Sequence, residues 1–215
     1  MIPAPTTKLV IKGLSNMGAD IPLHQAPPVS RGMVTKIVSH YVVKKDAKLA
    51  LAIWLMWKTA SRWDDVAYLT GAHFLVISPE EIIVHFQKTK ANQAMAYKMT
   101  SLVHVRDRMP MNGQAAVLRS LKKDEKLMTL SRETFVQRIR EVIAEPKLTG
   151  HSFKRGAADV LVRAAEEKII PHSLIPQLLK HADPSNEFPE HTLAYTSTPE
   201  SYARIFGSGA ATILL

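Results

Sequence analysis

The sequence predicts a mostly α-helical fold with a small three-stranded antiparallel sheet, and two observations indicate this class. Through most of the 215 residues, apolar side chains recur three or four positions apart, which is the spacing of one helix face. Between residues 74 and 99 the pattern changes, and residues 82–87 alternate between two faces, as in a strand with one buried side. We therefore expect one mostly α domain that carries a small sheet.

Helices open the predicted domain. Ser30 is placed to cap a helix over 31–43, and Asp46 is placed to cap a helix over 47–58. The second of these is apolar nearly all round, as expected of a helix at the centre of a core. Ser61 is then expected to cap a further helix, which carries acidic residues in its first turn.

Three short strands are expected next, over 74–77, 82–87 and 94–99. The segments between them contain residues typical of turns, Ser78-Pro79-Glu80 in the first and Lys88-Thr89-Lys90-Ala91-Asn92 in the second. The alternation in the middle strand predicts that the sheet is antiparallel and buries one face.

The rest of the chain has a helical pattern. Helices are expected over 114–123, from the cap Ser131 to about residue 143, and over 151–168, 174–180, 191–196 and 199–206. Residues 1–29 hold several prolines and little periodicity, so we expect an arm or linker ahead of a domain that spans 30–206. The tail 207–215 is small and apolar enough to dock on a neighbouring protomer.

Composition narrows the classes of function. The formal net charge of +9 favours a polyanionic partner, with nucleic acid as the first candidate and a basic protein without such a partner as the alternative. The absence of cysteine excludes a disulfide framework and a thiolate metal site. No apolar run approaches the length of a membrane span, and the N-terminus lacks a secretion signal, so we expect an intracellular protein without a membrane partner.

The stretch Leu148-Thr149-Gly150-His151-Ser152-Phe153-Lys154-Arg155-Gly156 is the strongest candidate for a functional site. A Thr-Gly turn leads into a helix whose first turn carries His151, Lys154 and Arg155. Residues three apart share a helix face, so His151 and Lys154 are expected to point the same way from a helix N-terminus, where unpaired N–H groups suit a phosphate. A solvated basic helix end is the alternative.

Further segments extend this pattern. Arg62 is followed three positions later by Asp65, and Lys88 lies in a turn between two predicted strands. Two more segments follow the Lys154 helix, Leu178-Leu179-Lys180-His181 and Thr192-Leu193-Ala194-Tyr195-Thr196. Over roughly 30–206, the order of these boxes resembles the catalytic domain of the tyrosine recombinases (phage integrases). The run His-Ser-Phe-Lys-Arg-Gly also resembles recombinases of some eukaryotic mobile elements.

The resemblance implies that a tyrosine attacks a DNA phosphodiester, forms a 3′-phosphotyrosine and releases a 5′-hydroxyl. It implies Tyr195 as the nucleophile, and as its catalytic partners Arg62, Lys88, His151, Lys154 and His181. It also implies DNA contacts by Arg62, Lys88, Lys90, Lys154 and Arg155. The bond energy stays in the protein–DNA link and fixed cations take the part of Mg²⁺, so neither a cofactor nor a metal is expected.

The implied partners are double-stranded DNA and further copies of the chain, which assemble on DNA as a tetrameric synapse. The implied location is inside the cell and on DNA, in a nucleus or nucleoid. Strand cleavage and rejoining by a site-specific recombinase is thus the leading function. A type IB topoisomerase-like nicking–closing enzyme, which acts alone on one strand, is a related alternative.

One residue departs from the family pattern. The second arginine of the family is Lys154 here, and lysine keeps the charge but lacks the planar fork that binds phosphate through two hydrogen bonds. Loss of one transition-state donor costs on the order of a hundredfold in rate. Arg155 is a poor substitute, because one helix step turns a side chain by about 100°. We therefore expect either a slow recombinase or a DNA-binding domain of the same fold that has lost turnover.

Each assigned residue also has a simpler interpretation. A pair of opposite charges, a helix cap or a packed ring explains most such residues in an ordinary protein. The simpler interpretations are an ion pair of Arg62 with Asp65, a solvated turn lysine at Lys88 with Lys90 as the participant, a helix cap at His151, a packed core histidine at His181, and Tyr202 as the nucleophile in place of Tyr195.

Overall fold

The structure, a computed structural model, describes residues 26–86, 101–106, 109, 113–171, 175 and 179. Its elements, in chain order, are α2 (Arg31–Val43), α3 (Ala47–Lys58), α4 (Trp63–Ala67), the 3-10 helix η1 (Gly71–His73), β1 (Phe74–Ser78), β2 (Glu81–Phe86), β3 (Ser101–Arg106), α6 (Gln114–Ser120), α7 (Arg132–Ile143) and α8 (Gly150–Glu166). The described part of the chain is therefore mostly helical with a small sheet, as predicted.

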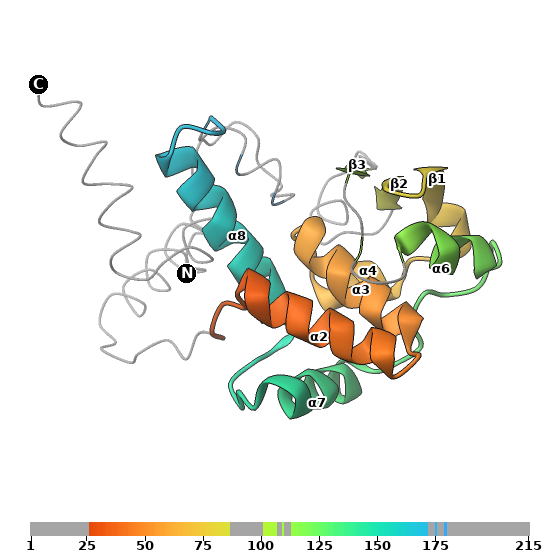
Figure 1. The fold of residues 1–215 in the computed structure, drawn as a ribbon, viewed down its shortest axis with the longest axis horizontal. Coiled ribbons are helices and arrows are strands. Elements are labelled where there is room, and N and C mark those ends of the chain that lie inside the picture. Colours follow the sequence, from red (N-terminus) through yellow and green to blue (C-terminus); the bar gives the residue numbers. More distant parts are fainter. Residues whose placement is uncertain are drawn as a thin grey trace, which may run out of the picture.

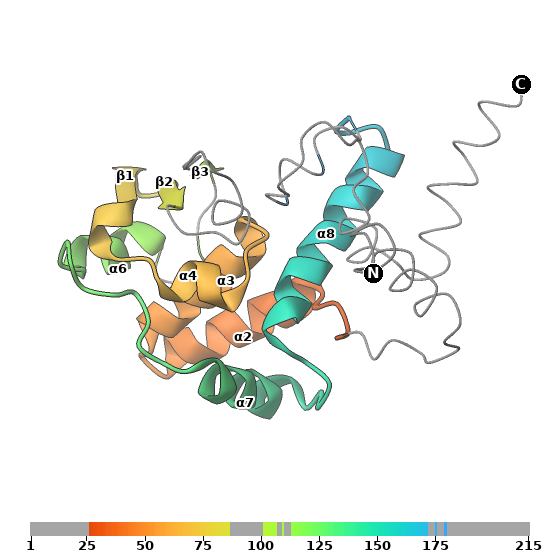
Figure 2. The same ribbon diagram turned by 180° about the vertical axis from the view of Figure 1, so that it is seen from behind.

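Helix α3 forms the centre of the described fold. All of residues 49–56 are buried, and the helix packs against α2, α4, α6 and α8. Figures 1 and 2 show α8 on one side of α3, and the sheet with α6 on the other. Although α3 is apolar nearly all round, neither it nor any other helix among the described residues is long and apolar enough to cross a bilayer. The prediction that 47–58 forms the core helix is confirmed.

Side-chain caps begin three helices as predicted. The side chains of Ser30, Asp46 and Ser131 each accept a hydrogen bond of 3.2 Å from the backbone N–H three positions later. Each bond satisfies a donor that the first helical turn leaves without an internal partner. The starts of α2, α3 and α7 agree with the predicted ones for this reason.

The three strands form an antiparallel sheet in the order β1-β2-β3. In β2, Ile82, Val84 and Phe86 are buried and the residues between them are half-buried, which confirms the alternation. Strands β1 and β2 lie where two strands were predicted. The third prediction is wrong in position, because the strand paired with β2 is Ser101–Arg106, whereas 94–99 lies outside the described residues. Pairing decided this position, since Ile82 lies opposite Val105 and Val84 opposite Val103.

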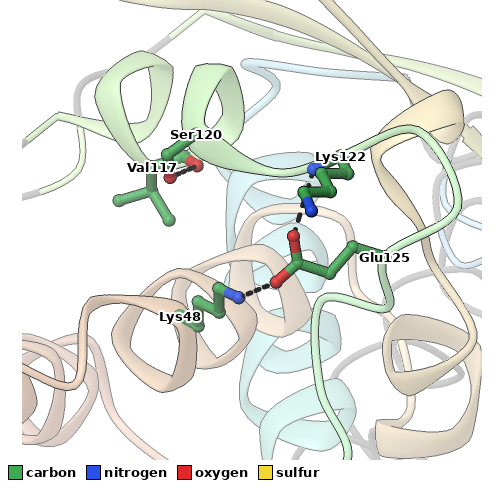
Figure 3. Close-up of polar contacts among 5 residues, drawn as sticks. All are labelled: Lys48, Val117, Ser120, Lys122 and Glu125. Atoms are coloured by element: carbon green, nitrogen blue, oxygen red, sulfur yellow. Dashed lines mark hydrogen bonds and ion pairs between the residues drawn. The ribbon is translucent and has the colours of Figure 1, made fainter.

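Helix α6 ends at Ser120, three residues before the predicted end. Glu125 accepts a hydrogen bond from the Lys122 N–H at 3.1 Å and also pairs with Lys48 of α3, so the chain turns back after the helix (Figure 3). Ser120 Oγ donates to the Val117 carbonyl at 2.7 Å in the last turn. The turn after α6 is therefore held by Glu125, whose carboxylate binds both the main chain of the turn and a lysine of α3. The helices expected over 174–180, 191–196 and 199–206 lie outside the described residues, apart from positions 175 and 179.

The segment ahead of α2 packs on α8. Val29, at the end of the predicted arm, is buried, and its N–H donates to the Ser152 carbonyl at 3.1 Å. A Cβ on Gly156 would lie 1.9 Å from the Val29 carbonyl oxygen, so glycine is needed where the two segments cross. This contact anchors the chain ahead of α2 on the helix that carries the candidate site.

Candidate functional site

Arg62 is held at the N-terminal end of α4. It is the N-cap residue with an extended backbone, and its N–H donates to Asp65 Oδ2 at 3.0 Å. The carboxylate of Asp65 thus binds the main chain of Arg62 and orients the start of the helix. Ser61, expected as the cap, is buried instead. It shares a hydrogen bond of 2.6 Å with Thr59, and its N–H bonds to Met56 in the turn that closes α3.

Three buried aromatic rings join the elements that carry the site. Trp63 of α4 stacks on Phe135 of α7 with ring centroids 4.1 Å apart, and Phe135 lies 5.8 Å from Phe153 of α8. A Cβ on Gly150 would lie 3.4 Å from the Trp63 Cβ, so α8 begins close against α4. Because rings packed in a dense core have little freedom to shift, this cluster holds the end of α4 and the start of α8 in one arrangement.

Thr149 caps α8. Its hydroxyl oxygen accepts a hydrogen bond from the His151 N–H at 3.2 Å, and its own N–H donates to Ser152 Oγ at 3.0 Å. The interpretation of His151 as the helix cap is therefore wrong, because a threonine two positions earlier takes that role. The His151 side chain is exposed.

The surroundings of His151 favour its neutral form. Partial burial lowers the pKa of the imidazole below its ordinary value, and the positive charges of Arg62 and Arg132 lower it further. The charge of Asp64 opposes this effect. A neutral imidazole on the surface is able to accept a proton from a neighbouring group.

Lys154 is buried in the fold. Its side chain is only 3% exposed, and Nζ donates a hydrogen bond of 2.6 Å to the Leu179 carbonyl. Lys154 and His151 were expected to point the same way from the start of the helix. The structure gives them different surroundings, because His151 is exposed and Lys154 is buried. Burial lowers the pKa of Lys154 to about 7, with a further decrease from Arg62 and an increase from Asp65. Arg155 is half-buried.

The buried lysine is expected to make the free energy of unfolding depend on pH. In the unfolded chain Lys154 has its ordinary pKa of 10.5, against about 7 when folded. Between these values the unfolded chain binds a proton that the folded chain does not, so stability increases as the pH rises. Relative to Lys154→Met, the wild type is expected to gain about 2 kcal/mol between pH 7 and pH 9.

Urea unfolding of both proteins at a series of pH values measures this difference. Because all other titrating groups are shared, they cancel in the comparison. Stability profiles that run parallel over this range would show that Lys154 keeps an ordinary pKa when folded.

A groove between α7 and the start of α8 adds two cations that sequence reasoning missed. It has a volume of about 810 Å³, and its lining includes His151, Arg132 and Arg140 together with acidic side chains of α7. Arg132 forms an ion pair with Asp64, and Arg140 Nε donates to the Leu148 carbonyl at 2.9 Å. No motif marks these arginines. The one signal in the sequence is that Arg132 directly follows the cap Ser131, which places it at the start of a helix.

The fold thus brings together three of the predicted site residues, Arg62, His151 and Lys154. Gly150 at the start of α8 lies close against Trp63, the residue after Arg62, and the charge of Arg62 lowers the pKa of both His151 and Lys154. Arg155, assigned as a DNA contact, is described as well, on α8. The other assigned residues lie outside the described part of the chain, and these are Lys88, Lys90, His181 and Tyr195, with the rival Tyr202. Within the described residues, no three His, Asp or Glu side chains gather in a way that would hold a metal ion.

Comparisons with known proteins relate this arrangement to solved structures. XerA recombinase aligns with a TM-score of 0.60 and 14% identity, over 94% of this chain and 72% of the other. The catalytic domain of bacteriophage HP1 integrase aligns with a TM-score of 0.53 and 16% identity, over 84% of this chain and 94% of the other. No family model and no curated protein matches the sequence. The chain therefore has the tyrosine recombinase catalytic-domain fold, as its sequence boxes implied.

Proposed function

We propose that this protein is a DNA strand transferase of the tyrosine recombinase type, which cleaves and rejoins DNA through a 3′-phosphotyrosine. The observation that supports the proposal best is the meeting of Arg62 from α4 with His151 and Lys154 from α8. Arg62 is far from the other two residues in sequence, and the fold that brings the three together resembles the folds of a recombinase and an integrase.

In the proposed reaction the Tyr195 oxygen attacks phosphorus, and the bond to the 5′-oxygen of the next nucleotide breaks. The planar fork of Arg62 neutralises the charge that builds on the non-bridging oxygens. A free tyrosine has a pKa of about 10, so its proton needs an acceptor. His151 suits this role because its lowered pKa keeps it neutral. Lys88 is the proposed donor of a proton to the leaving oxygen, and His181 the further phosphate donor.

Rejoining is the reverse of cleavage. The 5′-hydroxyl of another strand attacks the phosphotyrosine and releases the Tyr195 oxygen, which regains a proton. The proposed partners are double-stranded DNA, attracted by the net charge of +9, and further copies of the chain in a tetrameric synapse. We propose that this takes place inside the cell, in a nucleus or nucleoid.

A second candidate function is a DNA-binding domain of the same fold that has lost turnover. It is favoured by the enclosure of Lys154, which stands where the family has its second phosphate-binding arginine. If Lys154 does not bind the phosphate, one contact that stabilises the transition state is missing. The same missing contact would make the proposed recombinase slow.

The test is the formation of a protein–DNA adduct that resists SDS. The protein is incubated with a pool of nicked duplexes, in which the cleaved strand end diffuses away and the covalent link accumulates. We expect an adduct with the wild type and with Tyr202→Phe, and none with Tyr195→Phe. Retained DNA binding without an adduct in any variant would favour the binding domain instead.

Strand exchange separates the recombinase from a topoisomerase-like enzyme. Intact labelled and unlabelled duplexes replace the nicked pool, so that cleaved ends stay available for rejoining, and joined products that carry both are measured. A recombinase produces them, whereas a nicking–closing enzyme only relaxes supercoiled DNA and religates each strand to its own partner.

A further inference from the structure

The ammonium group of Lys154 is bonded to the main chain of another segment. Leu179, which accepts this bond, also donates its N–H to the Ile175 carbonyl at 2.9 Å, so these two residues close a helical turn. Carbonyl oxygens at the end of a helical turn lack an internal partner, and lysine side chains commonly satisfy them. The bond of 2.6 Å therefore ties α8 to the turn that contains Leu179.

The hydrogen bond between Lys154 and Leu179 lies beside an apolar contact between α8 and the same turn. Ile175 and Leu179 are fully buried in a cluster with small side chains of α8, among them Ala157, Ala158 and Val162. Apolar contacts of this kind are not directional, whereas a hydrogen bond sets the position and orientation of the turn along the helix. Leu179 stands two residues before His181 in the sequence.

We propose that Lys154 is a positioning residue, which holds the turn that precedes His181 against α8 rather than binding the scissile phosphate. The proposal rests on the proposed function, because the position of His181 matters only if strands are cleaved. In this proposal the lysine that replaces the family's arginine has a structural role. Arg62 then binds the phosphate without help from Lys154.

Two features of the site argue against a contact between Lys154 and phosphate. The side chain is 3% exposed, so an anion of the DNA backbone cannot approach Nζ without the site opening. The charged groups that act on the amine are Arg62, which disfavours its charge, and Asp65, which favours it, and burial outweighs both. A group whose surroundings weaken its positive charge is a poor phosphate ligand, but an amine donates a hydrogen bond in either protonation state.

The first experiment measures the rate of adduct formation on nicked duplexes in two variants. Lys154→Gln keeps an N–H donor without a charge, and Lys154→Met has neither. We expect Lys154→Met to lower the rate of adduct formation by about tenfold, which is the factor that one ordinary hydrogen bond contributes. Lys154→Gln is expected to lower the rate less. Equal losses in the two variants, or a faster rate in Lys154→Arg, would assign the effect to charge at the phosphate and overturn the proposal.

A double-mutant cycle with His181→Ala shows whether Lys154 acts through His181. If it does, Lys154→Met lowers the rate in the wild type but not in the His181→Ala background. Independent losses that multiply would show that the lysine does not act through this residue. Thermal unfolding of every variant identifies losses that come from misfolding alone.

DNA binding tests the proposal without any catalysis. The salt dependence of affinity measures how many phosphates the protein neutralises, and Arg62→Met is expected to reduce the slope of log K against log[salt] by about 0.9. Lys154→Met is expected to leave this slope unchanged, and an equal reduction would overturn the proposal. Absence of an adduct in the wild type would contradict the proposed function, whereas the slope result decides separately whether Lys154 contacts phosphate.

Discussion

Replacing Arg62 with alanine is expected to lower the rate of adduct formation by about 100- to 1000-fold, as removal of one preorganised donor to a developing negative charge does in other enzymes. Arg62→Lys is expected to lose most of this rate as well, because an ammonium group does not bind two phosphate oxygens in fixed geometry. The Asp65 carboxylate binds the main chain of residue 62 and remains in place in both variants, so the start of α4 is expected to persist.

Arg119→Ala is the matched control for this prediction. Arg119 is exposed on α6, which lies on the opposite side of α3 from α8 (Figure 1), so its loss removes one positive charge without touching the site. A similar loss of rate in both variants would assign the effect to net charge. Titration of the His151 ring by NMR gives a second measurement. The pKa of His151 is expected to rise in Arg62→Ala, because the arginine lowers it in the wild type.

Replacing Phe135 with alanine is expected to lower the free energy of unfolding by about 3 to 5 kcal/mol, the usual cost of removing a large aromatic side chain from a core. Phe135 is fully buried, and its ring contacts both Trp63 and Phe153. The variant lacks the ring that both α4 and α8 contact, so the two helices are held less firmly, and adduct formation is expected to fall even at temperatures where the variant stays folded.

Urea unfolding measures the first effect, with the midpoint shifted and the slope unchanged. Tyr68→Ala is the control, because this ring is exposed and its removal is expected to change stability by no more than about 0.5 kcal/mol. A Phe135→Ala protein that unfolds at the wild-type urea concentration would show that the three rings do not hold the site together.

Local chemistry made several elements predictable. Ser30, Asp46 and Ser131 begin their helices because a short polar side chain binds the N–H three positions later, an interaction that depends only on neighbouring residues. The third strand was misplaced because β3 is positioned by its pairing with β2, which lies elsewhere in the chain. Ser61 was assigned as a cap for a different reason, because its bonds to Thr59 and Met56 are local but belong to the end of α3 rather than to the start of α4.

By itself, the sequence determined the class of the fold and the boxes that hold the candidate chemistry, because periodicity, caps and motif order are local properties. Only the tertiary structure decided what surrounds each residue. Arg132 joins the site because α7 packs beside α8, and the buried amine of Lys154 bonds to the main chain of Leu179, 25 residues later. Burial and nearby charge set the pKa of Lys154, and both depend on residues that are distant in sequence but adjacent in the folded protein.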